Sequence, residues 1–112
     1  MNQTPHPLDI ARRRWLAGLE AAYRQAPTAD NALAFARGCW MCGEYDAAID
    51  IFRDAAQRAP ERAEYPLAFV RSASMLGMRD VEDATLRVAL ERHPQSVELT
   101  LHAALRRCSD DA

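Results

Sequence analysis

Two cysteines three residues apart, Cys39 and Cys42 in the run Cys-Trp-Met-Cys, are the first residues whose spacing could do chemistry. Such a pair works as a redox dithiol when it opens a helix after a strand, because the helix N-terminus lowers the pKa of a thiol. Here the pair falls in the last turns of a predicted helix, where that effect is missing. We therefore predict that Cys39 and Cys42 are structural and behave as small buried hydrophobic residues.

The remaining chemistry-bearing residues are not predicted to form a metal or catalytic site. A zinc site would need a second pair of ligands at a recognisable spacing, which Cys108, His93 and His102 do not provide. The chain also has no glycine-rich phosphate loop, and no serine or cysteine has a positioned base. The sequence thus predicts no metal, no cofactor and no enzymatic activity.

The charge pattern gives no sign of a nucleic-acid partner. All 14 basic side chains are arginines, and 16 carboxylates balance them to a net charge of −2. Arg12, Arg13 and Arg14 are consecutive, but a short basic run amid carboxylates is typical of a solvated helix face. Nucleic acid is therefore not predicted as a ligand.

Length and composition predict a single soluble, all-helical domain. The chain has 112 residues, of which 49% are hydrophobic, and it contains few glycines and almost no β-branched runs. No apolar run is long enough for a membrane span, and residues 1–9 do not resemble an export signal. Three cysteines, an odd number, without such a signal are expected to be reduced thiols in the cytoplasm.

The chain repeats itself at a fixed offset in the numbering. Positions 33–43 read LAFARGCWMCG and positions 67–77 read LAFVRSASMLG, an offset of 34 with six of eleven positions identical. Pro60 and Pro94 keep this offset, whereas the offset from Pro27 to Pro60 is 33. A repeat of this length predicts two helices per repeat, with each repeat stacked on the next.

Apolar residues recur every three or four positions, the period of a helix with one buried face. The buried stripes are predicted to hold Ala32, Phe35, Ala36 and Cys39 in one helix and Tyr45, Ala48, Ile49, Phe52 and Ala56 in the next. Gly43 and Gly77 are expected to end helices in the left-handed conformation, and Pro66 is tolerable only in the first turn of its helix. We predict helices at residues 7–25, 30–42, 45–58, 64–76, 79–92 and 96–108.

One segment resembles the second half of a tetratricopeptide (TPR) repeat. It consists of Gly43-Glu44-Tyr45-Asp46 followed by Ala48, Phe52, Ala55 and Pro60. The resemblance implies an all-α superhelix of about six antiparallel helices, in which small residues let the helices approach and neighbouring repeats stack. The second copy has Arg79 and Glu82 in place of Tyr45 and Ala48, which leaves the register of residues 79–84 open.

The resemblance also implies an organisation of the single domain, 1–112. It comprises a flexible N-terminus at 1–6, an N-terminal half repeat at 7–28, repeats at 29–62 and 63–96, a C-terminal half repeat at 97–108 and an acidic tail at 109–112.

In TPR proteins the first helices of successive repeats line a concave face, and the resemblance places a partner-binding groove there. Its residues are predicted to be Leu33, Arg37, Trp40, Met41, Leu67, Arg71, Met75, Leu101 and Leu105. They lie on a different stripe from the core residues, so we expect them to be partly exposed. The alternative is that the first helix of the chain, or a second copy in a homodimer, covers this stripe.

A groove lined by leucine and methionine suits an amphipathic helix of a partner protein, whose carboxylates Arg37 and Arg71 would orient. A looser resemblance, in size and helix order, is to the bacterial type III secretion chaperones that sequester the C-terminal helix of a needle subunit. The alternative function is a general TPR adaptor or scaffold subunit of another complex. Both are non-enzymatic interaction modules, without a nucleic-acid or membrane partner.

Overall fold

The chain is all-helical over the residues that the structure describes. The computed structural model describes the backbone of residues 6–111 and the side chains of residues 6–109. Its helices are α1 (Pro7–Gln25), α2 (Ala29–Met41), α3 (Tyr45–Arg58), α4 (Glu64–Met75), α5 (Arg79–Arg92) and α6 (Val97–Asp111). The predicted all-α class, with about six helices, is confirmed, and the arrangement is consistent with a TPR-like one.

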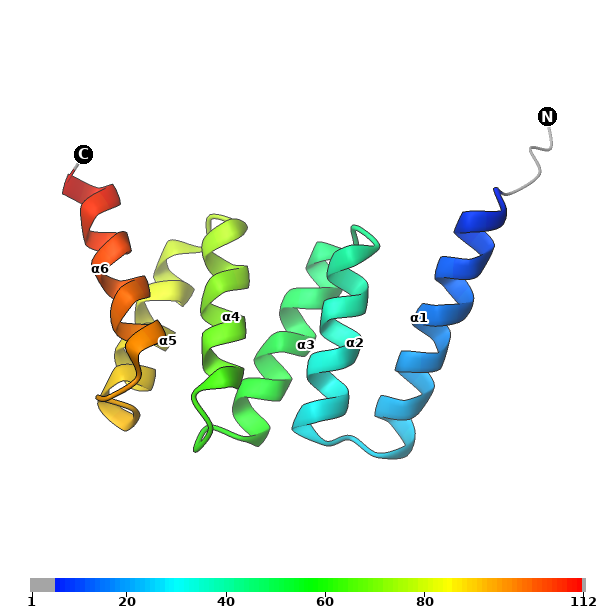
Figure 1. Ribbon diagram of the computed structural model, residues 1–112, viewed down its shortest axis with the longest axis horizontal. Helices are drawn as coiled ribbons and strands as arrows, with labels where there is room; N and C mark the ends of the chain where they lie inside the picture. The colour runs from blue at the N-terminus through cyan, green and yellow to red at the C-terminus, as the bar shows by residue number, and fades with distance from the viewer. Residues whose placement is uncertain (1–5, 112) are drawn as a thin grey trace.

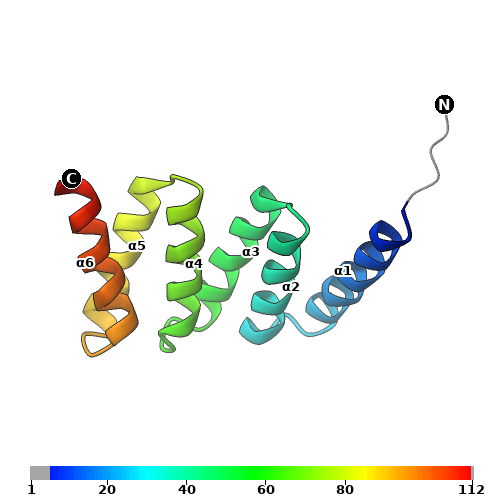
Figure 2. The same cartoon turned by 45° about the horizontal axis from the view of Figure 1, so that its top comes forward.

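Successive helices run in opposite directions along an elongated array (Figure 1). Each helix packs mainly against its neighbours in the chain, and the molecule measures 51 × 36 × 20 Å. Helices α2, α4 and α6 form one layer, and α3 and α5 lie behind them in both views (Figures 1 and 2). This layering is expected when each two-helix unit contacts only its neighbours.

The helix ends follow from a few residues with special backbone roles. Gly43 and Gly77 have φ angles of 79° and 71°, the left-handed conformation predicted for them. At the start of α2 the Thr28 hydroxyl accepts a hydrogen bond from the Asn31 N–H at 3.1 Å. Pro66 lies in the first turn of α4, where its missing N–H costs little.

The core confirms most of the predicted buried stripes. Ala32, Ala36 and Cys39 of α2 pack with Ala48, Ile49, Phe52 and Ala55 of α3 and with Tyr65, Phe69 and Ala73 of α4. Three predicted members lie at the edge of this core: Phe35 and Ala56 are half-buried, and Tyr45 is exposed. The Tyr45 ring instead packs against the Trp40 ring in edge-to-face geometry, with ring centroids 4.8 Å apart.

The two ends of the chain differ from the predicted organisation in detail. The sequence predicts His6 in a flexible N-terminus, but it caps α1 by accepting the Leu8 N–H at 3.0 Å. The predicted acidic tail is, through Asp111, the last part of α6. The rest of these two segments, residues 1–5 and 112, lies outside the described residues.

Helix α1 contacts α2 at Gly38, where there is no room for a larger residue without a shift. A Cβ atom at Gly38 would lie 2.6 Å from Leu19 Cδ1 and 3.1 Å from Leu16 Cδ1. One repeat later, at an offset of 34, the position holds the small and buried Ser72. A small residue here lets the preceding helix approach closely.

Candidate functional site

Two exposed methionines at equivalent positions of α2 and α4 face the same hollow. Met41 and Met75 hold the same position in successive repeats and are 75% and 73% exposed. The hollow has a volume of about 240 Å³ and is lined by Arg37, Trp40, Met41, Phe52, Arg71, Ser72 and Met75. Five of the predicted groove residues therefore come together, and we call this hollow the α2–α4 groove.

Trp40 forms a wall of the α2–α4 groove and is held there by two aromatic rings. Its ring centroid lies 4.8 Å from that of Tyr45 and 6.3 Å from that of Phe52, both in edge-to-face geometry. Because Phe52 is buried in the core, these contacts connect the groove to the core of the fold.

The α2–α4 groove is cationic at its rim. Arg37 and Arg71 are both exposed and both line it. The Arg71 Nη2 atom lies 3.5 Å from Glu98 Oε2, an exposed ion pair of the kind that contributes at most about 1 kcal/mol. Arg37 has no ion-pair partner among the described residues. Both guanidinium groups are thus accessible to carboxylates of a ligand.

The expected exposure of Leu33 and Leu67 is wrong. These side chains are only 7% and 6% exposed, and each belongs to a core cluster. Leu67 packs with Leu86 of α5 and Leu99 of α6, because the following helices close over it. The two leucines are therefore core residues and do not line the α2–α4 groove.

The two predicted groove residues of α6 are exposed but lie outside the α2–α4 groove. Leu101 is 56% exposed and Leu105 is 61% exposed. Leu105 lines a separate polar hollow of about 360 Å³ together with Ser74, Gly77, Arg79, Glu82, His102, Arg106 and Ser109. Leu101 occupies the repeat position of Leu33 and Leu67, but no later helix of the described chain packs over it.

The chain's own first helix does not cover the α2–α4 groove. Helix α1 packs on α2, and it meets that helix at Gly38 through Leu16 and Leu19. The high exposure of Met41 and Met75 shows that the described part of the chain leaves the groove open. Coverage by a second copy remains the alternative to a separate partner.

The cysteine pair has the environment of structural thiols. Cys39 is buried near the end of α2, and Cys42 is its half-buried C-cap residue. Burial, followed by the nearby Glu44 carboxylate, raises the pKa of the Cys39 thiol to about 11. No group of three or more potential metal ligands occurs among the described side chains.

A buried carboxylate in α5 is a feature that the sequence analysis did not assign. The Glu82 side chain is 3% exposed, and its Oε2 atom lies 2.6 Å from His102 Nε2 of α6. Its Oε1 atom lies 3.3 Å from Arg106 Nε, so the two helices are joined by a buried polar cluster. The sequence clue to this carboxylate was that Glu82 stands at the repeat position of the small Ala48. The structure settles the register of residues 79–84, because Glu82 is buried as Ala48 is.

Comparisons with known proteins do not name a family for this chain. No family model matches it, and no curated protein matches it. None of the described helices has the length and apolar character required to cross a membrane.

Proposed function

We propose that this protein is a non-enzymatic interaction module that binds an amphipathic helix of a partner protein in the α2–α4 groove. The observation that carries the proposal is the exposure of Met41 and Met75 on either side of one hollow. Methionine is flexible and polarizable, so two exposed methionines adapt to the apolar face of a ligand helix.

The charges at the rim specify the polar side of the ligand. Arg37 and Arg71 lie at equivalent repeat positions and both line the groove. A ligand helix with carboxylates beside its apolar stripe would pair with both guanidinium groups. The expected partner segment is therefore an acidic amphipathic helix, whose charges guide orientation and association rate more than affinity.

Two glutamate substitutions test this function without disturbing the core. Met41→Glu and Met75→Glu place charges on exposed positions, so the thermal melt should be almost unchanged. The partner recovered with the wild-type protein from its host, once purified, should bind each variant about tenfold or more weakly by calorimetry. Unchanged affinity would contradict the proposed groove.

A matched control separates groove effects from a general effect of added charge. Val97 of α6 is exposed and does not line the α2–α4 groove. Val97→Glu adds the same charge to a similarly exposed apolar position and should leave the affinity unchanged. Arg37→Ala should weaken binding more at low salt than at high salt, because salt screens exposed charges.

The kind of partner decides between the two biological roles that the resemblance suggests. A secretion chaperone would keep a short, self-polymerising helical protein soluble, whereas an adaptor would bind a protein that is stable by itself. Light scattering of the purified partner, alone and with an equimolar amount of this protein, distinguishes them. Suppressed polymerisation supports the chaperone role, and a partner that is already monodisperse supports the adaptor role.

A further inference from the structure

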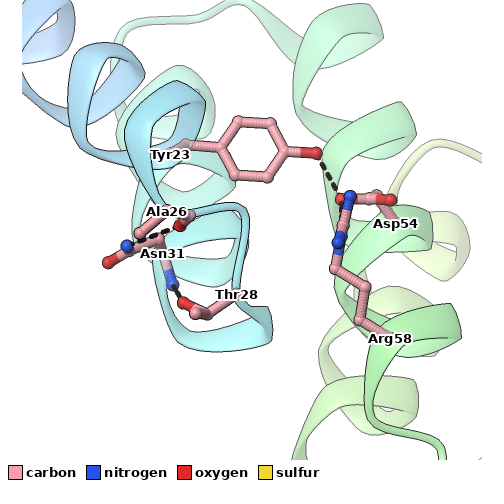
Figure 3. A network of polar contacts seen from close by, with 6 residues as sticks. All are labelled: Tyr23, Ala26, Thr28, Asn31, Asp54 and Arg58. Atoms are coloured by element: carbon pink, nitrogen blue, oxygen red, sulfur yellow. Dashed lines mark hydrogen bonds and ion pairs between the residues drawn. The ribbon is translucent and has the colours of Figure 1, made fainter.

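The space between α1 and α3 is bridged by an aromatic residue and a carboxylate. Tyr23 of α1 donates its hydroxyl hydrogen bond to Asp54 of α3, and its ring lies 5.9 Å from that of Phe35 on α2 (Figure 3 shows the Tyr23–Asp54 contact). Arg58 completes the cluster, with its Nε atom 2.7 Å from Asp54 Oδ2 and its guanidinium 6.0 Å from the Tyr23 ring centroid. A ring, a carboxylate and an arginine thus occupy this space.

The next unit of the array lacks two of these groups. The proline spacing relates α1 to α3 by an offset of 33 and α3 to α5 by an offset of 34, so Ala56 takes the place of Tyr23 and Val88 the place of Asp54. The phenylalanine beside the ring and the arginine are both retained: Phe69 takes the place of Phe35, and Arg92 takes the place of Arg58. The ring and the carboxylate are therefore the groups that are missing.

The missing groups leave a hollow between α3 and α5, which we call the α3–α5 groove. It has a volume of about 570 Å³, within the range of binding pockets. Ala56, Val88, Phe69 and Arg92 all line it, so the hollow lies where the two groups are absent. It opens on α3 and α5, in the other layer from the α2–α4 groove.

The rim of the α3–α5 groove carries two arginines. Arg92 has no ion-pair partner among the described residues, because Val88 stands where Asp54 binds Arg58. Arg53 lies with its guanidinium 5.4 Å from the Phe69 ring centroid, and its Nη1 atom lies 3.6 Å from Oδ1 of the exposed Asp50, which does not line the groove. The preceding unit has Glu20 at the position of Arg53. The α3–α5 groove is thus more cationic than its bridged counterpart and favours an acidic ligand.

We propose that the α3–α5 groove binds a segment of a partner protein that inserts an aromatic side chain between Ala56 and Val88 and presents a carboxylate to Arg92. The ligand would supply the two groups that Tyr23 and Asp54 supply in the preceding unit. An inserted ring gains apolar burial and contact with an arginine, and a carboxylate gains a charge-assisted hydrogen bond. This site is separate from the α2–α4 groove and does not depend on the function proposed for it.

Short synthetic peptides are the probe. The test peptide has a tyrosine between two pairs of glutamates and blocked ends, and binding is followed through the backbone amide NMR signals of the full chain. We expect shifts concentrated at Ala56, Thr85 and Val88. A peptide with alanine for the tyrosine, and one with glutamine for every glutamate, should each bind about tenfold or more weakly.

The decisive variant fills the α3–α5 groove with the same residue pair that fills the preceding unit. Ala56→Tyr combined with Val88→Asp recreates the Tyr23–Asp54 pair one unit later, and it should abolish peptide binding while the thermal melt does not fall. If the double variant does not fold, Arg92→Glu decides, because this exposed substitution removes the partner of the carboxylate. Arg87→Glu is its matched control, since Arg87 is an exposed arginine of α5 that does not line the groove.

Three results would overturn the proposal. The first is the absence of peptide-induced shifts up to the solubility limit, and the second is equal binding of the tyrosine and alanine peptides. The third is unchanged peptide binding by a folded Ala56→Tyr/Val88→Asp variant. If that double variant does not fold, unchanged peptide binding by Arg92→Glu is the third result. Met41→Glu should leave peptide binding intact, which keeps the outcome distinct from that of the α2–α4 groove.

Discussion

Glu82 and Arg106 meet in the interface between α5 and α6, with 3.3 Å between Glu82 Oε1 and Arg106 Nε. One repeat earlier, at an offset of 34, the same two positions hold Ala48 and Ser72. The C-terminal interface therefore replaces two small residues with a buried ion pair. A buried pair contributes little net stability, but removal of one partner leaves a charge in an unfavourable environment.

Removal of Glu82 alone should destabilise the protein. Glu82→Ala removes the buried carboxylate that lies beside both Arg106 and His102, so the free energy of unfolding should fall by about 3 kcal/mol. The double variant Glu82→Ala/Arg106→Ser restores the residue types of the preceding interface and should cost clearly less than Glu82→Ala. Urea denaturation measures both. A double variant at least as unstable as Glu82→Ala would contradict this account of the interface.

The Tyr23 to Asp54 hydrogen bond should contribute stability that depends on pH. Burial raises the pKa of the Asp54 carboxyl, but hydrogen bonds from Tyr23 and Arg58 lower it more, so it lies below its ordinary value. A carboxyl with a lowered folded pKa stabilises the fold above about pH 4, and this contribution is lost as the pH falls through the folded pKa. Tyr23→Phe should therefore cost about 1 kcal/mol at neutral pH and less in acid.

The stability that the Tyr23–Asp54 hydrogen bond contributes should also be lost at high pH. Hydrogen bonding to Asp54, followed by burial, raises the pKa of the Tyr23 hydroxyl, so its contribution is complete below about pH 10 and is lost as the pH rises through the folded pKa. Urea titrations of wild type and Tyr23→Phe across pH measure the difference. Tyr45→Phe removes the hydroxyl of an exposed tyrosine and is the matched control for the substitution itself.

The leucines of the predicted groove should behave as core residues and its methionines as surface residues. Leu67→Ala should lower the free energy of unfolding by about 2–5 kcal/mol, because the side chain is buried among Leu86 and Leu99. Met75→Ala, further along the same helix, should change it by no more than about 0.5 kcal/mol. Similar melting temperatures for the two variants would contradict the observed burial.

The three thiols should differ in reactivity. With a pKa raised to about 11 and a buried side chain, Cys39 should resist alkylation of the native protein near pH 8, because only the thiolate reacts. Cys108 is exposed on α6 and should react first. Mass spectrometry of iodoacetamide-treated protein, native and in urea, locates the modified residues. Native labelling of Cys39 as fast as Cys108 would show that α2 opens readily.

The helices could be predicted from the sequence because their signals are local. Gly43 and Gly77 end helices through their own backbone freedom, and Pro60 and Pro94 stand between helices, so all but one of the helix ends lie within one residue of the prediction. The exception is α6, which continues to Asp111 because no glycine or proline stops it at 108. The burial of Ala32 and Ala48 likewise followed from helical periodicity.

The candidate sites depended on contacts between repeats. Leu33, Leu67 and Leu101 share one residue type and one repeat position, but the first two are buried and the third is exposed. Periodicity gives the face of a helix on which a residue lies, and only the packing of the following helices decides whether that face is covered. The α3–α5 groove could not be predicted from the sequence either. Ala56 and Val88 replace Tyr23 and Asp54, but this exchange indicates a hollow only after the structure shows that Tyr23 and Asp54 are in contact.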